Sequence, residues 1–312
     1  MEIIRVRLIL EDSMERIRVT ALDNILGEKL PVLDKGFIRV VDYMGDDSSI
    51  VQAARVSYGK GTTTPEKDKA LLDYLLRHWH TSPFEMCEIK LHLKMPIFIA
   101  RQWVRHRTAN INEFSARYSF VPEEAYIPEE NHLGVQSEIN HQATVLNSLT
   151  PEEARAIRQR IIENTKHTYD TYLWAQNRNH DNTDKEHNEH QGLSRELARI
   201  NLSLNHYTEW YWKCDLHNLL HFLHLRDAPG AQLEIQRFAQ VIIEKILKVW
   251  VPWTYESFVQ HRQHAVQFSQ KSQAVLHDLV NNNPVKGRES YGLSSTEWRE
   301  FWEKLQMPDP QK

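Results

Sequence analysis

The clearest hydrophobic pattern in the chain lies at residues 87–95. Apolar side chains occupy every second position there, at Cys87, Ile89, Leu91, Leu93 and Met95. A period of two places alternate side chains on opposite faces of a β-strand. One buried and one solvated face are typical of an antiparallel sheet. The segment therefore predicts an antiparallel strand, which Pro96 ends before a short helix with the sequence IFIARQWVRHR.

Strand patterns also occur before this segment. Apolar and charged residues alternate near the N-terminus, and RIRVTAL follows the turn EDSME, which predicts a hairpin within residues 1–30. Residues 36–43 predict a further strand. Asp47 or Ser48 is then expected to cap a helix that runs through Tyr58.

The second half of the chain is mainly helical in pattern. The sequence TPEE at residues 150–153 is a capping box with proline at the first helical position. Other helices are predicted at residues 65–79, 194–207, 215–226, 231–249 and 295–305. Residues 177–191 contain no apolar side chain and predict a solvated loop or a disordered segment. Early strands followed by late helices favour an α+β fold.

Composition narrows the class of protein. The 312 residues, 41% of them hydrophobic, are enough for one substantial core. The two cysteines, Cys87 and Cys214, exclude a disulfide framework and fit a reducing cytoplasm. No apolar stretch is long enough to cross a bilayer, and the N-terminus has no uninterrupted signal-peptide core. The net charge of −4 means that any anion site must be a local group of arginines.

Such a group lies in residues 94–118, which carry a local charge of +4. Arg101 and Arg105 share a helix face because they are four residues apart. Asparagine, serine and glutamate side chains stand between Arg107 and Arg117. Guanidinium groups hold phosphate bidentately, and amide or carboxylate groups read the edge of a base. The window predicts a nucleotide site, with a solvated, salt-bridged helix face as the alternative.

The sequence around and after this window contains several distinctive blocks. Arg105-His106-Arg107 is followed, after seven residues, by Ser115. The blocks are HTSPFE at 80–85, PIFIARQWVRHR at 96–107, NEFSARYS at 112–119, LAR at 197–199, DLHNLLHFLHLR at 215–226 and AQLEI at 231–235. In order and spacing they resemble the flavin-dependent thymidylate synthase family. Gly230 departs from the resemblance, because many members have histidine there.

The resemblance covers about residues 33–258. It implies an α+β fold with a twisted, mostly antiparallel sheet flanked by helices. The implied domain is residues 31–262, with a variable helix and polar loop at 128–192 and extensions at 1–30 and 263–312.

The same resemblance implies the reductive methylation of dUMP to dTMP. In the family, 5,10-methylenetetrahydrofolate supplies the one-carbon unit, FAD reduced by NADPH supplies the hydride, and tetrahydrofolate is released. The resemblance also implies a homotetramer with active sites shared between subunits, in the cytoplasm, with neither nucleic acid nor a membrane as partner.

Site residues follow from the resemblance position by position. FAD is expected at Ser82, Arg105, His106, Arg107, Glu113, Asp215, His217 and His221. The nucleotide dUMP is expected at Gln102, Arg105, Glu113, Ser115, Ala116, Arg117, Arg199 and Arg226. Arg226 is the expected catalytic residue, because a guanidinium can stabilise the uracil anion. His80 is expected at the folate and flavin edge, and cations of the RHR triplet are expected to suit the FAD pyrophosphate.

Other interpretations use the same residues differently. Ser115 is expected to donate to phosphate rather than attack as a nucleophile, since no adjacent base is evident. Cys87, on the apolar face of a strand pattern, is expected to be inert. His217, His221 and His224 share a helix face and would suit a metal-dependent hydrolase, although the resemblance implies no metal. A non-catalytic nucleotide- or RNA-binding protein is the remaining alternative.

Overall fold

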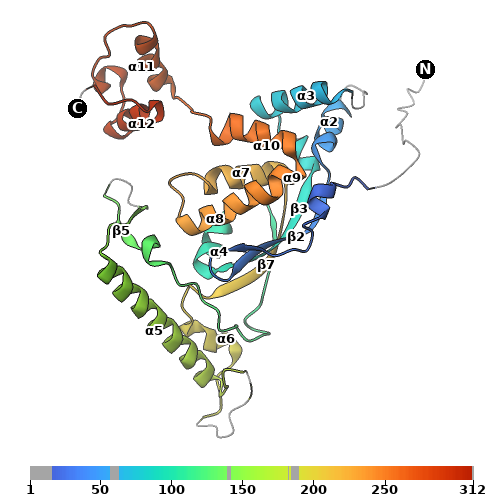
Figure 1. The fold of residues 1–312 in the computed structure, drawn as a ribbon, viewed down its shortest axis with the longest axis vertical. Helices are drawn as coiled ribbons and strands as arrows, with labels where there is room; N and C mark the ends of the chain where they lie inside the picture. The colour runs from blue at the N-terminus through green and yellow to red at the C-terminus, as the bar shows by residue number, and fades with distance from the viewer. Residues whose placement is uncertain (1–15, 57–62, 139–141, 182, 184–189, 311–312) are drawn as a thin grey trace. The chain divides into compact units, whose positions relative to one another are not determined.

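The structure is a computed structural model, and it describes residues 16–56, 63–138, 142–181, 183 and 190–310 (Figure 1). The chain divides into two compact units, Met1–Phe258 and Val259–Lys312. The first unit is built on a five-stranded antiparallel sheet. From one edge to the other, its strands are β1 (Leu30–Val32), β2 (Gly36–Met44), β3 (Glu88–Pro96), β7 (Tyr207–Asp215) and β4 (Asn110–Glu113). The expected α+β fold with an antiparallel sheet is confirmed.

Strand β3 lies at the centre of this sheet. Leu91 pairs with Val40 of β2 on one side and with Trp212 of β7 on the other. The apolar residues of β3 at alternate positions, from Ile89 to Met95, are completely buried. The strands predicted at residues 36–43 and 87–95 are therefore confirmed.

Strand β7 was not predicted from the sequence. The helix expected over residues 194–207 is limited to α6 (Arg195–Ala198) and one 3₁₀ turn, and an extended strand follows. Trp210, Trp212 and Cys214 of β7 are buried in the core. Large apolar residues at every second position were the signal for a strand, because aromatic side chains favour the pleated surface of a sheet.

A layer of helices covers one face of the sheet (Figure 1). Its members are α2 (Asp47–Val56), α3 (Pro65–Arg77), α4 (Ile97–Trp103), α7 (Leu216–Arg226), α8 (Leu233–Val241), a π-helical stretch (Ile242–Leu247), α9 (Lys248–Trp250) and α10 (Pro252–Phe258). This agrees with the helices predicted at residues 65–79, 215–226 and 231–249. The described helices include none that is long and apolar enough to cross a membrane.

Aromatic side chains fill the core between the sheet and these helices. The ring of Trp103 lies 4.3 Å from that of Phe222 and 5.4 Å from that of Trp212, measured between centroids. All three side chains are almost completely buried. This packing fixes α4 and α7 against each other, because a close-packed interior does not tolerate shifts of its elements.

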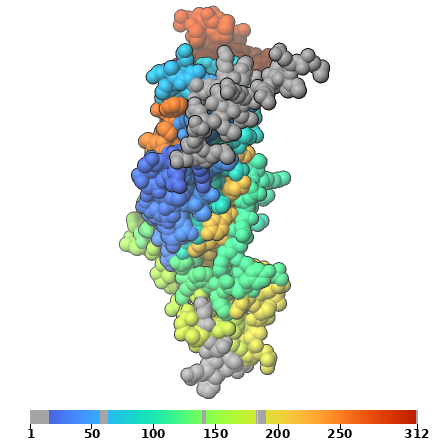
Figure 2. Space-filling model, turned by 90° about the vertical axis from the view of Figure 1, so that its right-hand side faces the viewer, coloured from blue at the N-terminus to red at the C-terminus, as the bar shows by residue number. Residues whose placement is uncertain are grey.

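The opposite face of the sheet carries polar side chains. His92 of β3 lies between Arg39 and Glu209, at 2.5 Å and 2.8 Å from their polar atoms. Residues of β7 reach the surface on this side, seen in gold in Figure 2, and Tyr211 is among the exposed ones. The sheet thus has the one wet face that the pattern of β3 predicted.

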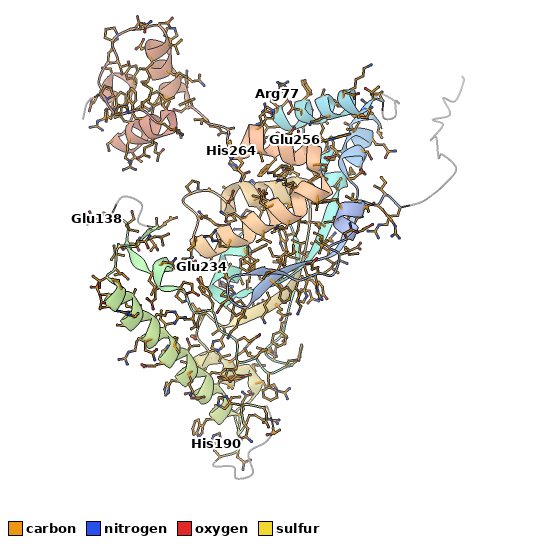
Figure 3. The ribbon with its side chains drawn as sticks, viewed as in Figure 1. Arg77, Glu138, His190, Glu234, Glu256 and His264 are labelled. Carbon is orange, nitrogen blue, oxygen red and sulfur yellow. The ribbon has the colours of Figure 1, made fainter. Side chains whose placement is uncertain are left out.

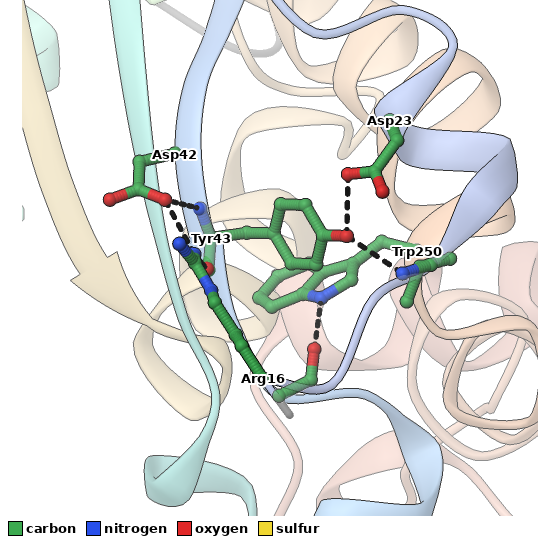
Figure 4. A network of polar contacts seen from close by, with 7 residues as sticks. Arg16, Asp23, Asp42, Tyr43 and Trp250 are labelled. Carbon is green, nitrogen blue, oxygen red and sulfur yellow. Dashed lines mark hydrogen bonds and ion pairs between the residues drawn. The ribbon is translucent and has the colours of Figure 1, made fainter. Parts of the chain in front are cut away.

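The segment before β1 differs from the expected hairpin. RIRVTAL contains the short helix α1 (Thr20–Asp23) instead of a strand, and the other predicted strand lies outside the described residues. The hydroxyl of Tyr43 accepts a hydrogen bond from Val19 N at 2.7 Å and donates to Asp23 at 2.7 Å (Figure 4). Leu22 is completely buried in the main core. Tertiary contacts with β2 therefore decide the conformation of this segment.

The start of α2 also differs from the prediction. Asp46, rather than Asp47 or Ser48, accepts the hydrogen bond from the main chain of Ser49, at 3.0 Å. The carboxylate of Asp47 turns instead to the first turn of α10. The expected end of this helix at Tyr58 lies outside the described residues.

Helix α5 (Pro151–Ala175) begins with the predicted capping box. Thr150 Oγ1 accepts from the main-chain N–H of Glu153 at 3.3 Å, and the Glu153 carboxylate accepts from Thr150 N at 2.9 Å. Helix α6 and the 3₁₀ turn after it pack against α5. Before α5, β5 (Gly134–Gln136) and β6 (Thr144–Leu146) form a separate two-stranded sheet.

The second unit has a core of its own. Its helices are α11 (Gln270–Val280), which was not predicted, and α12 (Ser295–Leu305), which was. The buried core residues are Val275, Leu293, Trp298, Phe301 and Trp302.

Candidate active site

Arg226 joins the ends of two helices. It is the last residue of α7, and its Nε donates to His106 Nε2 at 3.2 Å. One terminal nitrogen of the same guanidinium donates to the main-chain oxygen of Gln102, in the last turn of α4, at 3.1 Å. Carbonyl oxygens at a helix C-terminus attract a cation. The guanidinium is therefore fixed, although two of its N–H groups are already used.

His106 is neutral at physiological pH. Its burial, then the nearby charges of Arg226 and His221, lower the pKa of His106 from 6.5 to about 4. The hydrogen bond from Arg226 requires a lone pair on Nε2, which agrees with a neutral ring. The cations of the RHR triplet are therefore the two arginines, and His106 contributes a neutral ring.

The two arginines of the triplet have a different environment. The side chains of Arg105 and Arg107 are exposed, and within the described part of the chain neither forms a hydrogen bond or an ion pair. The ring of His221, on α7, lies 5.5 Å from the ring of His106. Unpaired guanidinium groups beside imidazole rings suit a dinucleotide that carries a pyrophosphate and flat ring systems. The residues present therefore fit FAD.

Asp215 and His217 lie at the beginning of α7. Asp215 caps the helix, since its carboxylate accepts from Asn218 N at 2.9 Å and from the Asn218 side chain at 2.7 Å. His217 follows in the first turn and is partly exposed. His217 and His221 are four residues apart, so both project from the same side of α7 as the RHR contact.

A second cluster gathers the expected phosphate-binding residues. Ser115 Oγ accepts from the main-chain N–H of Arg117 at 3.3 Å, with Ala116 between them. Arg117 forms an ion pair with Glu196 of α6, at 2.8 Å. The Nε of Arg199 donates to the main-chain oxygen of Glu196 at 3.2 Å. Arg117 thus contacts the carboxylate of Glu196, Arg199 contacts its main chain, and Ser115 contacts the main chain of Arg117.

The main chain after Arg117 is held firmly. Arg195 donates to the carbonyl oxygen of Tyr118 at 2.9 Å, and its guanidinium lies 4.5 Å from the ring centre of Phe120. Arg178 lies 4.9 Å from the same ring. Cation–π contacts of this kind stabilise by about 0.5–1 kcal/mol at exposed sites. These contacts fix the loop that presents Ser115 and Arg117.

Two further contacts connect expected residues to their surroundings. Glu113, on edge strand β4, accepts from the hydroxyl of Thr208 at 2.7 Å. The side chain of Gln102 donates to that of Gln232, just before α8. Glu234, labelled in Figure 3, follows at the start of α8.

His80 and Ser82 lie apart from these contacts. Both are exposed, after the end of α3. The main-chain N–H of His80 donates to Leu75 O at 2.9 Å, and its ring lies 5.8 Å from that of Tyr74. Ser82 O accepts from Glu85 N at 3.2 Å, so Ser82 begins a turn. Their expected roles at FAD and folate remain predictions.

The chain offers no evident cysteine nucleophile. Cys87 and Cys214 are both buried and unbonded to each other. Burial raises the pKa of Cys87 to about 12 and that of Cys214 well above its usual value. A thiol is reactive only as its thiolate, so neither side chain is activated. This agrees with the expectation that Cys87 is inert.

The histidines of α7 do not supply a metal centre in the structure. Among the described residues, there is no group of three or more histidine, cysteine, aspartate and glutamate side chains that could hold a metal ion. The metal-dependent alternative therefore has no geometric support.

Glu196 was missed by the sequence interpretation. It stands three residues before Arg199 and 79 positions after Arg117, so its partner cannot be read from the local sequence. The only sequence signal for Glu196 was that its carboxylate lies close in sequence to Arg199, an expected phosphate ligand.

Comparisons with known proteins extend this picture. Residues 39–253 match the family model described as Thy1, thymidylate synthase complementing protein. A flavin-dependent thymidylate synthase of Rickettsia bellii is 49% identical over 296 residues, which cover 94% of this chain and 98% of that protein. One of Anaplasma marginale is 49% identical over 295 residues, with coverages of 95% and 96%.

Solved structures give a consistent result. A UMP/dUMP methylase, PolB, from Streptomyces cacaoi, bound with 5-Br dUMP, superposes with a TM-score of 0.63 at 27% sequence identity. The match covers 75% of this chain and 99% of that one. The structure of the same enzyme bound with 5-Br UMP gives a TM-score of 0.62.

Proposed function

The chain belongs to the flavin-dependent thymidylate synthase family, and from that premise we propose which of its residues carry the reaction. It is a thymidylate synthase that methylates dUMP to dTMP, with FAD, NADPH and methylenetetrahydrofolate as cofactors and co-substrate. The observation that carries the residue assignment is the guanidinium of Arg226, fixed by a neutral histidine and a helix carbonyl.

We propose that Ser115, Arg117 and Arg199 hold the phosphate of dUMP. The ion pair between Arg117 and the Glu196 carboxylate supports this role, because a carboxylate and a phosphate oxygen attract the same donors. We propose that Gln102, Arg105, Glu113, Ala116 and Arg226 line the rest of the nucleotide. The bound 5-Br dUMP of the PolB structure is consistent with a uracil nucleotide as ligand.

Contacts of the proposed nucleotide residues form two clusters, one of Arg226 with His106 and Gln102 and one of Arg117 and Arg199 with Glu196. Since one nucleotide needs both, we propose that subunits of a homotetramer share each active site. Oligomers of identical chains commonly have closed symmetry, which lets two surfaces of the chain meet repeatedly.

FAD is proposed to lie along the first cluster. Arg105 and Arg107 would pair with its pyrophosphate, and Ser82, His106, Glu113, Asp215, His217 and His221 would contact the remainder. His80 is proposed at the folate and flavin edge. When bound, FAD reduced by NADPH supplies the hydride that completes the methyl group. The unpaired guanidinium groups of Arg105 and Arg107 support this assignment.

The proposed catalytic role of Arg226 is electrostatic. Negative charge develops on the uracil ring when C5 acts as a nucleophile, and a fixed guanidinium stabilises that charge without reorganising. Arg226 remains charged even though burial lowers its pKa, because a guanidinium is protonated far above physiological pH. The buried cysteines leave the reaction without a protein nucleophile in this proposal.

The enzyme is proposed to work in the cytoplasm. Its two cysteines are free, and cytosolic proteins keep their thiols reduced.

The test of this assignment is the variant Arg226→Ala. We expect it to retain the flavin absorbance spectrum and to lose dTMP formation by about 10²-fold or more, as for other fixed donors that stabilise developing charge. Product is measured from dUMP, methylenetetrahydrofolate and NADPH. Arg237→Ala, an exposed arginine of α8, is the matched control and should retain turnover. Normal turnover in Arg226→Ala would contradict the proposed role.

A further inference from the structure

Glu196 holds one of the proposed phosphate-binding arginines. The Nε of Arg117 donates to one carboxylate oxygen of Glu196 at 2.9 Å, and a terminal nitrogen of the guanidinium forms an ion pair with the same oxygen at 2.8 Å. The two donors that form this contact are those that a guanidinium offers to a phosphate. Substrate and Glu196 therefore compete for the same face of Arg117.

The geometry points to Glu196 as a placeholder for the phosphate of dUMP, an inference that rests on the phosphate role proposed for Arg117. In the ligand-free enzyme the carboxylate keeps Arg117 in place. When the nucleotide binds, its phosphate takes over the guanidinium and Glu196 is released to solvent.

The strength of the ion pair suits such an exchange. The side chains of Arg117 and Glu196 are 55% and 57% exposed. Exposed pairs of this kind stabilise weakly, because water and salt screen both charges. A phosphate monoester carries more charge than a carboxylate and offers more acceptor oxygens, so it displaces Glu196 readily.

The main chain around Arg117 and Glu196 is held in place, so we expect the exchange to move side chains only. Arg195 and Phe120 fix the loop after Arg117, as described above. The main chain of Glu196 accepts from Arg199 at 3.2 Å, which keeps α6 next to the second proposed phosphate ligand. The side chain of Glu196 can therefore turn away while Arg117 and Arg199 keep their positions.

The experiment measures dUMP binding to the FAD-containing enzyme by titration calorimetry, without folate or NADPH. In Glu196→Gln the competing charge is lost, so we expect dUMP to bind about two- to five-fold more tightly, the range expected for an exposed pair. Glu152→Gln is the matched control: Glu152 forms an exposed ion pair with Arg155 at 2.7 Å on α5, and its loss should leave dUMP affinity unchanged.

A second pair of variants separates competition from simple repulsion. With Arg117→Ala as background, adding Glu196→Gln should tighten dUMP binding by less than it does in the native sequence. Equal tightening in both backgrounds, or unchanged or weaker binding in Glu196→Gln alone, would overturn the placeholder role.

The same measurements distinguish this inference from the proposed function. If Arg117→Ala leaves dUMP affinity unchanged, Arg117 is no phosphate ligand, and the site assignment fails together with the placeholder. If Arg117→Ala weakens binding and Glu196→Gln also weakens it, Glu196 positions Arg117 and only the placeholder is rejected.

Discussion

The imidazole of His106 shows how a side chain's surroundings change its chemistry. The sequence places it between two arginines, where a third cation would be easy to assume. Burial and the nearby charge of Arg226 favour the neutral ring instead. His106 therefore accepts a hydrogen bond from the proposed catalytic guanidinium and contributes no charge of its own.

We expect the His106 ring to titrate near pH 4, well below the ordinary histidine value of 6.5. An NMR titration of the ring protons measures this midpoint directly. In Arg226→Ala the midpoint should rise, because one lowering charge is removed, but stay below 6.5, because burial is the larger cause. A midpoint near 6.5 in the native protein would contradict the neutral state.

The same shift predicts how stability depends on pH. Between pH 6.5 and about pH 4, the unfolded chain binds a proton at His106 that the folded protein does not. The contribution of His106 to the free energy of unfolding is therefore fully present at neutral pH and falls as the pH drops through this window.

Helix α10 depends on a carboxylate from another helix. Asp47, in the first turn of α2, accepts from Trp253 N at 2.8 Å, from Thr254 N at 3.0 Å and from the Thr254 hydroxyl at 2.7 Å. A helix N-terminus leaves its first N–H groups unsatisfied, and Asp47 fills that need. Burial is nevertheless the dominant influence on the carboxyl group, and it raises the pKa of Asp47 to about 6.

We expect Asp47→Ala to lower the free energy of unfolding by about 1–3 kcal/mol, because buried donors lose their acceptor. Chemical denaturation monitored by tryptophan fluorescence measures the change. Asp47→Asn keeps an acceptor oxygen and avoids burying a charge, so its cost should be smaller. Equal costs for the two variants would show that Asp47 does not act as an acceptor here.

The helices and strands differ in how well the sequence predicts them. β3 was predictable because its period of two is strict, and α5 because its capping box is local. β4 is exposed along its whole length, so no hydrophobic pattern marks it. β7 carries a visible alternation, but the helical pattern before it was extended too far. The edge position of β4 and the pairing of β7 with β3 determine these two strands, and the sequence pattern encodes neither.

The candidate site was also only partly predictable from the sequence. The family resemblance identified the site residues, and their order along the chain supports a nucleotide site. The contacts between them depend on segments far apart in the chain, such as Arg226 with His106 at a separation of 120 positions. Such pairings form only when the core brings α4 and α7 together. The sequence therefore identifies the candidate site residues, and the fold determines which of them contact each other.

The chain as a whole divides into two compact units. The candidate site residues all lie in the unit Met1–Phe258. The PolB structure matches 75% of this chain and 99% of its own, whereas the Rickettsia bellii relative matches 94% of this chain. We therefore expect the chemistry to reside in the first unit.

The proposed sharing of each active site between subunits has a genetic consequence. If each nucleotide is bound by Arg226 of one subunit and Arg117 of another, two inactive variants can rescue each other. We expect Arg226→Ala and Arg117→Ala chains to be inactive by themselves and to regain dTMP formation when co-expressed. Mixed tetramers, isolated with a different affinity tag on each variant, would contain some active sites in which both Arg226 and Arg117 are intact. A lack of rescue in such hybrids would mean that each polypeptide completes its own catalytic centre.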